Sequence, residues 1–298
     1  MKHVFIVNPN AGKEKYKDFI VCAKRLKNDY DINLEITTKP EEIGVVIDKY
    51  KNLDDFRLYS VGGDGTINGI INCILSKKMN KKIPLGIVPT GTANDVSRYI
   101  YNEESWNYKK NLPLLLNGKE KKVDVGKVNE RFFLNISSIG FDANAAKEAY
   151  RFKKLRFFPS SLSYYAGVIV ALLKKRPLHF KILIDDKSYS HKYLFVVIAN
   201  GRKYGGGVTP TPEALIDDGI FDICMVKDVS RLNALRILPV YIKGNHTGLS
   251  MINMVKCKKI SIESAVDVEL NVDGDIYTIR KADFEIIPGA LKIIVPQK

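Results

Sequence analysis

Cysteine, histidine and tryptophan are all scarce in this sequence of 298 residues. The four cysteines are Cys22, Cys73, Cys224 and Cys257. They are widely separated and form no Cys-x-x-Cys pair, so we expect reduced thiols rather than a disulfide framework. None of the four histidines stands near a cysteine or a carboxylate at zinc-ligand spacing, which argues against a zinc site. A serine–histidine hydrolase signature is absent as well.

Long hydrophobic runs are also lacking. The longest apolar stretch, residues 164–173, is far short of the roughly 20 residues that a membrane-spanning helix needs, and Lys174-Lys175-Arg176 follows it directly. The N-terminus, Met1-Lys2-His3-Val4-Phe5, lacks the apolar length of a signal peptide. Together with the reduced thiols, these features predict a cytoplasmic protein.

Acidic residues are fewer than basic ones, since 33 Asp and Glu stand against 47 Lys and Arg and leave a net charge of +14. This excess favours polyanionic partners such as a nucleotide, a nucleic acid or an anionic lipid surface. No RNA- or DNA-binding signature accompanies the charge, so we predict no specific nucleic-acid partner. The hydrophobic content of 45% is that of an ordinary globular protein, and the length favours two domains of roughly 150 residues each.

The first third of the sequence alternates short apolar strands with helical patterns. Strands are predicted at residues 4–7, 34–36, 58–61 and 85–88, and helices at residues 16–26, 43–50 and 67–75. Such alternation is typical of a parallel sheet with crossover helices. In sheets of this kind, ligands bind beyond the C-terminal ends of the strands.

The pattern changes after about Val123. Further strands are predicted at residues 123–128, 132–136, 180–184, 193–199, 221–226, 259–263, 267–272 and 291–295. A helical segment at residues 161–175, extended upstream over residues 143–157, interrupts them. We therefore predict an α/β domain over residues 1–122 and a β-rich, antiparallel domain over residues 123–298, whose last strand could return to the first domain.

The most informative motif is Gly62-Gly63-Asp64-Gly65-Thr66, which lies between a predicted strand and a predicted helix. Glycines let main-chain N–H groups approach an anion closely, and the helix N-terminus adds partial positive charge. A bare carboxylate inside such a turn would repel phosphate, so Asp64 indicates a divalent cation or an acid–base role. The alternative is a tight turn with no ligand.

Two more polar turns follow predicted strands. One is Pro89-Thr90-Gly91-Thr92-Ala93-Asn94-Asp95, and the other is Asn8-Pro9-Asn10-Ala11-Gly12-Lys13. The turn at Gly91 is not a Walker A motif, because Thr92 stands where that motif needs lysine. The turn at Gly62 is not a dinucleotide fingerprint, because it lacks the third glycine. Three such turns at neighbouring strand ends predict one cleft for phosphate and metal, with Asp95 as a metal-organising residue or a helix N-cap.

Taken together, these motifs resemble the catalytic domain of diacylglycerol and sphingosine kinases, especially the soluble bacterial lipid kinases. The second half extends the resemblance through Ala199-Asn200-Gly201-x-x-Tyr204-Gly205-Gly206-Gly207 and Pro212-x-Ala214-x-x-Asp217-Asp218-Gly219-x-Phe221-Asp222. The similarity covers nearly the whole chain. It implies an α/β N-terminal three-layer nucleotide-binding domain, an all-β C-terminal β-sandwich, and an active site between the two.

The resemblance also implies roles for individual residues. ATP would be bound by Asn8, Pro9, Asn10, Ala11, Gly12, Thr38, Gly62, Gly63, Asp64, Gly65, Thr66, Asn68 and Thr92. Catalytic Mg²⁺ would be organised by Asp64, Asp95 and Asp124, partly through water. The structural metal of the family's second domain would fall on Asp218 and the backbone carbonyls of Leu215 and Ile220, where a solvated turn is the alternative.

The chain departs from the family at one position. The family's Asp-Gly-Glu motif, whose glutamate is the proposed general base for the lipid hydroxyl, is Asp273-Gly274-Asp275 here. Aspartate is one methylene shorter, so Asp275 would need about 1 Å of compensation to reach the same hydroxyl. The alternative for Asp275 is a surface hairpin turn without a catalytic role.

A membrane-facing segment is predicted at residues 150–158, where cations alternate with aromatic residues before the apolar stretch 162–173. This composition suits docking on an anionic membrane surface. The alternative, with the same pattern of residues, is a helix that covers the core of the second domain and exposes a basic face to solvent. The β-rich half could also pair edge to edge in a homodimer.

We therefore predict an ATP- and Mg²⁺-dependent lipid kinase that visits the membrane peripherally. Its most favoured reaction is phosphoryl transfer from ATP to the hydroxyl of diacylglycerol, which gives phosphatidic acid. The alternatives are a kinase of another lipid or of NAD, and a non-catalytic nucleotide or lipid sensor, which the altered Asp275 favours.

Overall fold

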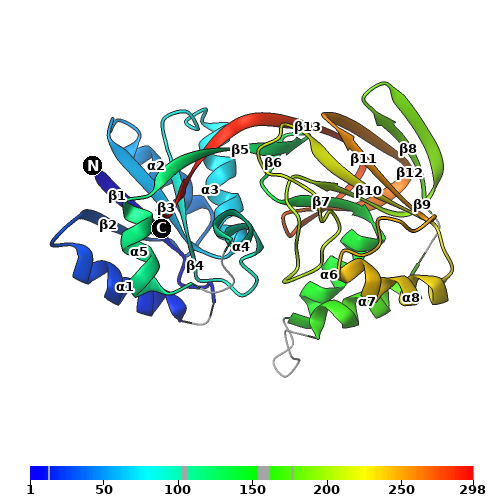
Figure 1. Cartoon of the computed structure of the whole chain (residues 1–298), viewed down its shortest axis with the longest axis horizontal. Helices are drawn as coiled ribbons and strands as arrows, with labels where there is room; N and C mark the ends of the chain where they lie inside the picture. The colour runs from blue at the N-terminus through cyan, green and yellow to red at the C-terminus, as the bar shows by residue number, and fades with distance from the viewer. Residues whose placement is uncertain (13, 103–105, 154–161, 176–177, 298) are drawn as a thin grey trace. The chain divides into compact units, whose positions relative to one another are not determined.

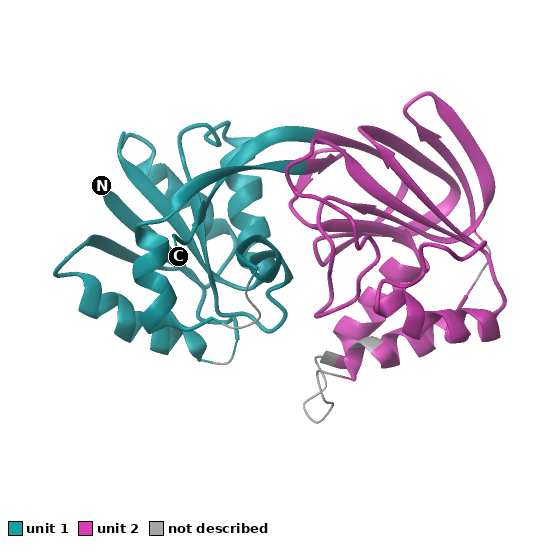
Figure 2. Cartoon of the chain, in the orientation of Figure 1, with its two compact units in different colours: residues 1–125, 287–298 teal, residues 126–286 magenta. Residues whose placement is uncertain are grey.

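The chain forms two compact units in a computed structural model that describes all residues except 13, 103–105, 154–161, 176–177 and 298. Unit 1 contains residues 1–125 and 287–298, and unit 2 contains residues 126–286 (Figure 2). The boundary therefore lies at Val125, and the C-terminal segment belongs to unit 1.

Unit 1 is built on a parallel sheet. Its strands β1 (Lys2–Val7), β2 (Asp31–Ile36), β3 (Phe56–Gly62) and β4 (Leu85–Pro89) lie in the order β4-β3-β1-β2. The end of β13 (Asp275–Val295) adds a further parallel strand beside β4, with Ile293 opposite Leu85. The residues of β1 from Val4 to Val7 are completely buried, as expected for a strand covered on both faces.

The described residues of this unit form the helices α1 (Lys15–Leu26), α2 (Glu41–Tyr50), α3 (Asp64–Ser76), α4 (Asp95–Tyr101) and α5 (Tyr108–Leu116). The chain moves from β1 outward to β2 and then returns past β1 to β3. Because such crossovers are right-handed, this reversal places α1 on one face of the sheet and α2 and α3 on the other. Accordingly, α1 packs against α5, and α2 against α3 (Figure 1). The three-layer α/β prediction is confirmed.

The strand order of unit 1 also locates a ligand site. The direction of travel through the sheet reverses between β1 and β3. At such a switch point, the loops that leave the two strands diverge to opposite faces and open a crevice at the C-terminal ends of the strands. The polar turns after β1 and β3 are therefore where the topology alone would place a ligand.

Unit 2 is an antiparallel β-sandwich. Its strands are β5 (Lys119–Val128, which begins in unit 1), β6 (Arg131–Phe133), β7 (Ile136–Gly140), β8 (Leu178–Ile184), β9 (Lys187–Ala199), β10 (Phe221–Lys227), β11 (Ile252–Cys257), β12 (Lys259–Val272) and the first part of β13. Strand β9 is buried on both sides: Val196 and Ile198 enter the core of the sandwich, whereas Phe195 and Val197 enter a second apolar cluster. The predicted β-sandwich is confirmed.

The described part of the unit also contains the helices α6 (Phe141–Lys153), α7 (Ser163–Leu173) and α8 (Arg231–Ile242). Helices α6 and α7 pack tightly on each other (Figure 1). Tyr241 of α8 joins the second apolar cluster of β9. The unit therefore has a helical layer beside its sheets, of which the sequence patterns predicted α7 and most of α6.

One predicted strand is wrong in its extent. Residues 132–136 do not form a continuous strand, because β6 ends at Phe133 and β7 begins at Ile136. The Asp273 carboxylate accepts hydrogen bonds from the backbone N–H groups of Leu134 at 2.8 Å, Asn135 at 3.2 Å and Ile136 at 2.9 Å. These groups are therefore turned toward a side chain instead of a neighbouring strand.

Candidate active site

The turns after β1, β3 and β4 meet at one edge of the unit 1 sheet. The Asn8 backbone N–H donates to the carbonyl of Val61 at 2.9 Å, and the Thr90 N–H donates to the carbonyl of Gly62 at 2.9 Å. The Asn8 side chain donates from Nδ2 to Thr66 Oγ1 at 3.0 Å. The three predicted turns therefore form one hydrogen-bonded edge.

Glycine is required where these turns touch. A Cβ on Gly12 would lie 1.4 Å from the carbonyl oxygen of Thr90, and Gly12 has a φ of +68°. A Cβ on Gly91 would lie 2.5 Å from the Cα of Gly63. Backbone packs directly on backbone here, so a side chain at either position would push the turns apart.

The loop after β2 joins the same edge. Asn10 donates from its backbone N–H to Asn8 Oδ1 at 2.9 Å and from Nδ2 to the carbonyl of Thr38 at 3.3 Å. The Thr38 N–H donates to Glu42 at 2.6 Å, which fixes the start of α2. Thr38 is thus brought beside the turn after β1, as the family resemblance implies.

The other predicted ATP-binding residues occupy different environments. Thr92 is exposed in the turn after β4. Asn68 is buried one turn inside α3, where its Oδ1 accepts a hydrogen bond from Asn72 at 2.6 Å. A nucleotide at this edge would therefore meet Thr92 directly, whereas Asn68 is already engaged within its helix.

Asp64 lies where two helices begin. It is the first residue of α3, and its carboxylate accepts from the backbone N–H groups of Asp95 at 3.4 Å and Val96 at 3.3 Å at the start of α4. Burial raises the pKa of Asp64, and the Val96 and Asp95 N–H groups oppose that shift. A carboxylate fixed at two helix N-termini is well placed to approach a cation held by phosphates.

Asp95 and Asp124 have different surroundings. Asp95 is buried as the first residue of α4, and the N-cap of that helix is Asn94, so the N-cap alternative for Asp95 is wrong. Asp124 is buried in β5, where its carboxylate accepts from the Gly289 backbone N–H of β13 at 2.6 Å. Asp64 and Asp95 are therefore joined by a hydrogen bond, whereas the Asp124 carboxylate is bonded to the backbone of β13.

Within the described residues, no three His, Cys, Asp or Glu side chains form a metal-binding group. Mg²⁺ is commonly held by one or two carboxylates together with substrate phosphates, so Asp64 and Asp95 fit such a shared site. Thr90 Oγ1 and Asn94 Oδ1 are buried without a hydrogen-bond partner among the described residues. These two atoms leave the turn after β4 able to bind a further polar group.

In unit 2, the motifs of the second half meet in another hydrogen-bonded cluster. Asp273 holds the bend at Asn135, whose side chain donates from Nδ2 to the carbonyl of Lys203 at 2.8 Å. The Asn200 N–H in turn donates to the carbonyl of Asn135 at 2.9 Å. The Asp-Gly-Asp turn and the segment that begins at Asn200 are thus connected through one asparagine.

Asp275 begins β13 directly after a tight hairpin turn. Asp273 and Gly274 both have positive φ values, +47° and +101°, and Asp275 pairs with Val272 across the turn. An Asp-Gly pair with two positive φ angles is typical of two-residue hairpins. Asp275 therefore does follow a hairpin turn, as the alternative prediction stated, and its carboxylate is exposed.

The environment of Asp275 favours a role as a general base. Partial desolvation raises the pKa of Asp275, while the Arg131 guanidinium and the Tyr277 hydroxyl oppose the shift. Arg131 lies 4.0 Å from the centre of the Tyr277 ring. A carboxylate with a raised pKa is a stronger base than an ordinary aspartate.

We expect Arg131→Gln to move the acid limb of activity to higher pH. Removal of the guanidinium eliminates a charge that lowers the pKa of Asp275, so the carboxylate will take up a proton at higher pH and cease to act as a base. The measurement is kcat/KM against pH for the lipid phosphorylation that the family resemblance implies. The matched control is Arg280→Gln, on the strand that Asp275 begins. The Arg280 guanidinium pairs with Asp267 at 2.6 Å. An unshifted acid limb in Arg131→Gln would contradict the assignment.

The predicted structural metal site contains a lysine. Asp218 accepts from the Ile220 N–H at 3.3 Å through Oδ1, and its Oδ2 lies 3.8 Å from Lys256 Nζ. Lys256 Nζ also lies 3.3 Å from the Asp222 carboxylate. Leu215, three residues before Asp218, has an exposed side chain. A divalent cation at Asp218 would have to compete with this ammonium, so the residues fit a metal poorly.

Lys256→Met should therefore increase the effect of Mg²⁺ on stability. With the ammonium removed, Asp218 and Asp222 lose their charge partner, and a cation that binds the folded state raises the melting temperature. The measurement is the melting temperature in EDTA and in Mg²⁺ for wild type, Lys256→Met and Lys258→Met, an exposed neighbour, as control. Equal Mg²⁺ effects in all three proteins would show that Lys256 does not occupy the site.

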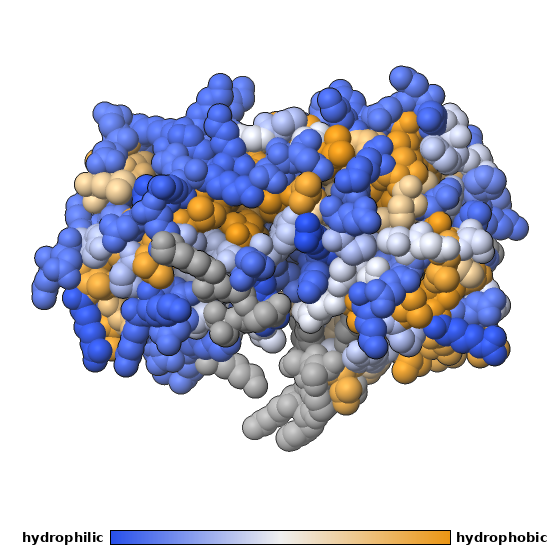
Figure 3. Space-filling view, viewed as in Figure 1, coloured by the Kyte–Doolittle hydropathy of each residue, from blue (hydrophilic) through white to orange (hydrophobic). Residues whose placement is uncertain are grey.

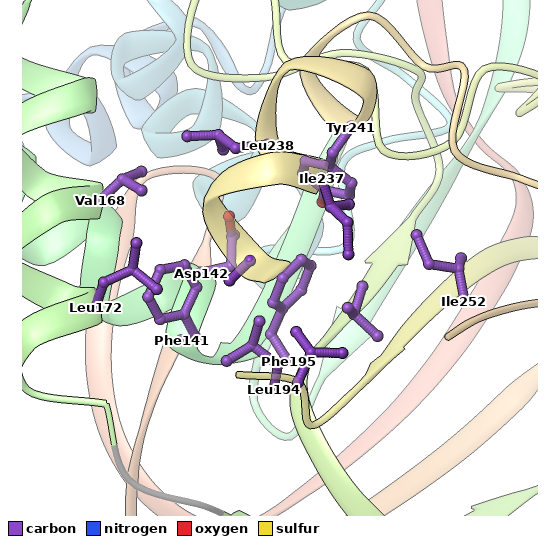
Figure 4. Close-up of a pocket in the computed structure, with 13 residues that line it drawn as sticks. Phe141, Asp142, Val168, Leu172, Leu194, Phe195, Ile237, Leu238, Tyr241 and Ile252 are labelled. Carbon is purple, nitrogen blue, oxygen red and sulfur yellow. The ribbon is translucent and has the colours of Figure 1, made fainter. Parts of the chain in front are cut away.

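An apolar cavity lies between α6, α7, α8 and the strands β9–β11 of unit 2 (Figure 4). Its volume is about 30 Å³, and its walls include Phe141, Val168, Leu172, Phe195 and Leu238. This is far below the roughly 300–1,000 Å³ of small-molecule sites. Of the described residues that line it, only Asp142 is acidic.

The same helices expose apolar side chains outward. On α7, Tyr165, Ile169 and Leu173 are 48%, 55% and 70% exposed and lie at i, i+4 and i+8, while Val168 and Leu172 face the cavity. Leu232 and Leu235 of α8 are exposed too, and Figure 3 shows apolar surface over this part of unit 2. A surface helix that is apolar on both faces is suited to an apolar environment on both sides.

Cations border this surface. Arg151 and Lys174 both pair with Glu148, at 3.0 and 2.8 Å. The predicted membrane segment, residues 150–158, lies outside the described residues from position 154 onward. None of the described helices is long and apolar enough to cross a bilayer.

Comparison with known proteins identifies both halves of the chain. Residues 2–128 match the diacylglycerol kinase catalytic domain, and residues 135–295 match the YegS C-terminal NAD kinase beta sandwich-like domain. A diacylglycerol kinase of Staphylococcus epidermidis is 27% identical over 98% of this chain and 91% of its own length. One of Mycobacterium tuberculosis is 28% identical over 79% of this chain and 75% of its own.

Solved structures agree with the sequence matches. A Bacillus anthracis crystal structure, described as that of a proposed diacylglycerol kinase, superimposes with a TM-score of 0.79 at 25% identity. The match covers 99% of this chain and 97% of the other. The likeness therefore includes both units.

Proposed function

Because the chain belongs to the family of lipid kinases that join a diacylglycerol kinase catalytic domain to a YegS-type β-sandwich, we propose that it transfers the γ-phosphoryl group of Mg·ATP to the hydroxyl of diacylglycerol. The product would be phosphatidic acid. The observation that carries the proposal is the convergence of the turns after β1, β3 and β4 on one edge of the unit 1 sheet.

Unit 1 would supply the nucleotide site. Main-chain N–H groups around Gly12, Gly63 and Gly91 would face the phosphates, and Asp64 with Asp95 would hold Mg²⁺ against them. Mg²⁺ neutralises charge on the transferring group when it is bound. Asp124, which the family resemblance assigns to the same metal, would act at longer range, since it already accepts from Gly289.

Unit 2 would supply the lipid site and the base. The exposed apolar side chains of α7 and α8 would contact the acyl chains, and Asp275 would take the proton from the lipid hydroxyl. No covalent intermediate is needed, since positioning and charge stabilisation carry most of the catalysis in phosphoryl transfer.

We further propose a cytoplasmic protein that docks peripherally on anionic membranes through the outward face of α7 and α8. Ile169→Asp together with Leu173→Asp should lower binding to phosphatidylglycerol vesicles about 10-fold or more, because each buried apolar side chain contributes about 1.5–3 kcal/mol. Val266→Asp replaces an apolar side chain that is 54% exposed elsewhere in unit 2 and serves as control in vesicle sedimentation. If all variants sediment alike, α7 is not the docking surface.

An acceptor panel separates the alternatives. Purified protein with γ-labelled Mg·ATP is offered diacylglycerol, ceramide, a sphingoid base, undecaprenol or NAD. Label in diacylglycerol supports the proposal. Label in another acceptor would show that this acceptor is the substrate instead. ATP binding without label in any acceptor would favour a non-catalytic sensor.

A further inference from the structure

The chain passes between the two units at two points. Unit 1 ends at Val125 and resumes at Ile287, so one crossing lies in β5 and the other in β13 (Figure 2). These two strands pair with each other. A feature that bends or stiffens the strand pair therefore acts on both connections at once.

Strand β13 is irregular at its crossing. Pro288 has no backbone N–H to donate, and Gly289 has a left-handed φ of +57°, which a regular strand does not contain. A Cβ on Gly289 would come no closer than 3.7 Å to the side chain of Lys122, so the backbone conformation, and not crowding, favours glycine here. A left-handed glycine inside a strand is typical of a β-bulge, at which the strand bends.

A carboxylate on the paired strand holds this bend. Asp124 lies on β5 directly before Val125 and is 2% exposed. Its Oδ1 accepts a hydrogen bond from the Gly289 backbone N–H at 2.6 Å. Hydrogen bonds to an ionised acceptor are shorter and stronger than those between neutral groups. Asp124 therefore links the two crossing strands at the point where β13 bends.

The other side of the crossing is fixed by packing. Gly126, the first residue of unit 2, pairs with Phe133 of β6, and a Cβ on it would lie 2.2 Å from the Phe133 ring. This ring is completely buried in the core of the sandwich. The unit 2 end of the crossing is thus held by an apolar core, and the unit 1 end by the bond between Asp124 and Gly289.

Strand β13 also carries the proposed base. Asp275 begins this strand in unit 2, whereas the three turns that would hold the nucleotide belong to unit 1. The base and the phosphoryl group are therefore supplied by different units, which the crossing strands connect. Since a misplacement of about 1 Å can lower a rate by about 10²-fold, the conformation of the crossing should affect catalysis.

We propose that Asp124 is a positioning residue that acts through Gly289: its carboxylate fixes the bend of β13 and so places Asp275 for proton transfer. The inference rests on the proposed function for the identity of the base. The bend itself is a property of the protein without any ligand, so it can be tested separately.

The first test measures the distance between the units in the full chain. Nitroxide labels are attached through Lys81→Cys in unit 1 and Lys187→Cys in unit 2, both at exposed positions. Cys22 and Cys73 are replaced by serine, and the other two cysteines are buried. Pulsed electron paramagnetic resonance then gives the distribution of label distances without nucleotide or lipid.

We expect Asp124→Ala and Gly289→Ala to shift or broaden this distribution. Asp124→Asn should keep the wild-type distribution, because its amide oxygen can still accept from the Gly289 N–H. Gly244→Ala, which introduces the same kind of left-handed strain at a φ of +79° in the turn after α8, is the matched control and should also keep it. Wild-type distributions in both Asp124→Ala and Gly289→Ala would overturn the proposal. If Asp124→Ala does not fold, Gly289→Ala and Asp124→Asn still decide.

Kinetics separates positioning from direct metal binding. Asp124→Ala should lower kcat for lipid phosphorylation about 10²-fold while KM for Mg·ATP and the Mg²⁺ requirement stay unchanged, and Asp124→Asn should restore most of kcat. An asparagine variant as poor as the alanine variant, with a higher Mg²⁺ requirement in both, would show that Asp124 acts on the metal and would overturn the proposal.

The two measurements also separate this proposal from the proposed function. Changed distances in Asp124→Ala, together with a wild type that transfers no phosphoryl group, would refute only the proposed function. Unchanged distances, together with normal phosphoryl transfer by wild type, would refute only the positioning role of Asp124.

Discussion

Asp275→Ala is expected to lower lipid phosphorylation about 10²-fold or more. The carboxylate is exposed at the start of β13, and its pKa is raised by partial desolvation. The other carboxylate of the turn, Asp273, already accepts from the backbone N–H groups of Leu134 and Ile136. Loss of a positioned general base typically costs 10²- to 10⁴-fold. The measurement is kcat in mixed micelles, with ATP and lipid affinities determined separately and expected to stay within about 3-fold.

Asp275→Glu is the matched control for this result. It introduces the residue that the family resemblance places here, and it should retain activity at or above the wild-type level if the hairpin holds the carboxylate at the proper distance. Near-normal turnover in Asp275→Ala would remove Asp275 from the mechanism. A glutamate variant as inactive as the alanine variant would show that the backbone has adjusted to aspartate.

Gly12→Ala is expected to abolish most ATP binding. The new Cβ would lie 1.4 Å from the Thr90 carbonyl oxygen, and Gly12 has a left-handed φ of +68°. The left-handed conformation alone costs about 1–2 kcal/mol for a non-glycine residue, and the overlap forces the turns after β1 and β4 apart. We expect an affinity for Mg·ATP reduced about 10-fold or more in calorimetric titration, together with a lower melting temperature.

Gly44→Ala provides the comparison. It lies in α2, where an added Cβ would be 3.7 Å from Cys73 Sγ, an ordinary contact. Alanine also favours a helix over glycine by about 1 kcal/mol, so this variant should be as stable as wild type or more stable and should bind ATP normally. Wild-type ATP affinity in Gly12→Ala would show that the edge formed by the three turns is not the nucleotide site.

Much of unit 1 could be predicted from the sequence because β1, β3 and β4 contain mainly apolar runs and helices alternate with the strands. Residues 4–7 and 58–61 are continuous apolar runs followed by polar turns, and both are buried parallel strands. The turn residues could also be placed together, since parallel strands end at one edge. Which backbone atoms touch, as at Gly12 and Thr90, depends on packing that no local pattern encodes.

Other features depend on contacts between distant residues. Helices α5 and α8 each contain a proline, Pro113 and Pro239, which in a sequence pattern argues against a helix. The bend between β6 and β7 is caused by Asp273, which is far away in sequence. The break therefore appears only once the chain has folded.

One contact at a predicted site could not be foreseen from the sequence. The sequence does not predict that Lys256 lies near Asp218, because this contact depends on how β10 and β11 pair.

The most direct test of the account is the initial rate of label transfer from γ-labelled Mg·ATP to dioctanoylglycerol, with the labelled product recovered by lipid extraction. Wild type and Gly44→Ala should give labelled phosphatidic acid at similar rates, and Asp64→Asn, which removes the carboxylate at the start of α3 and α4, should give almost none. Equal transfer in Asp64→Asn, or no labelled lipid from wild type that still binds Mg·ATP, would contradict the central claim.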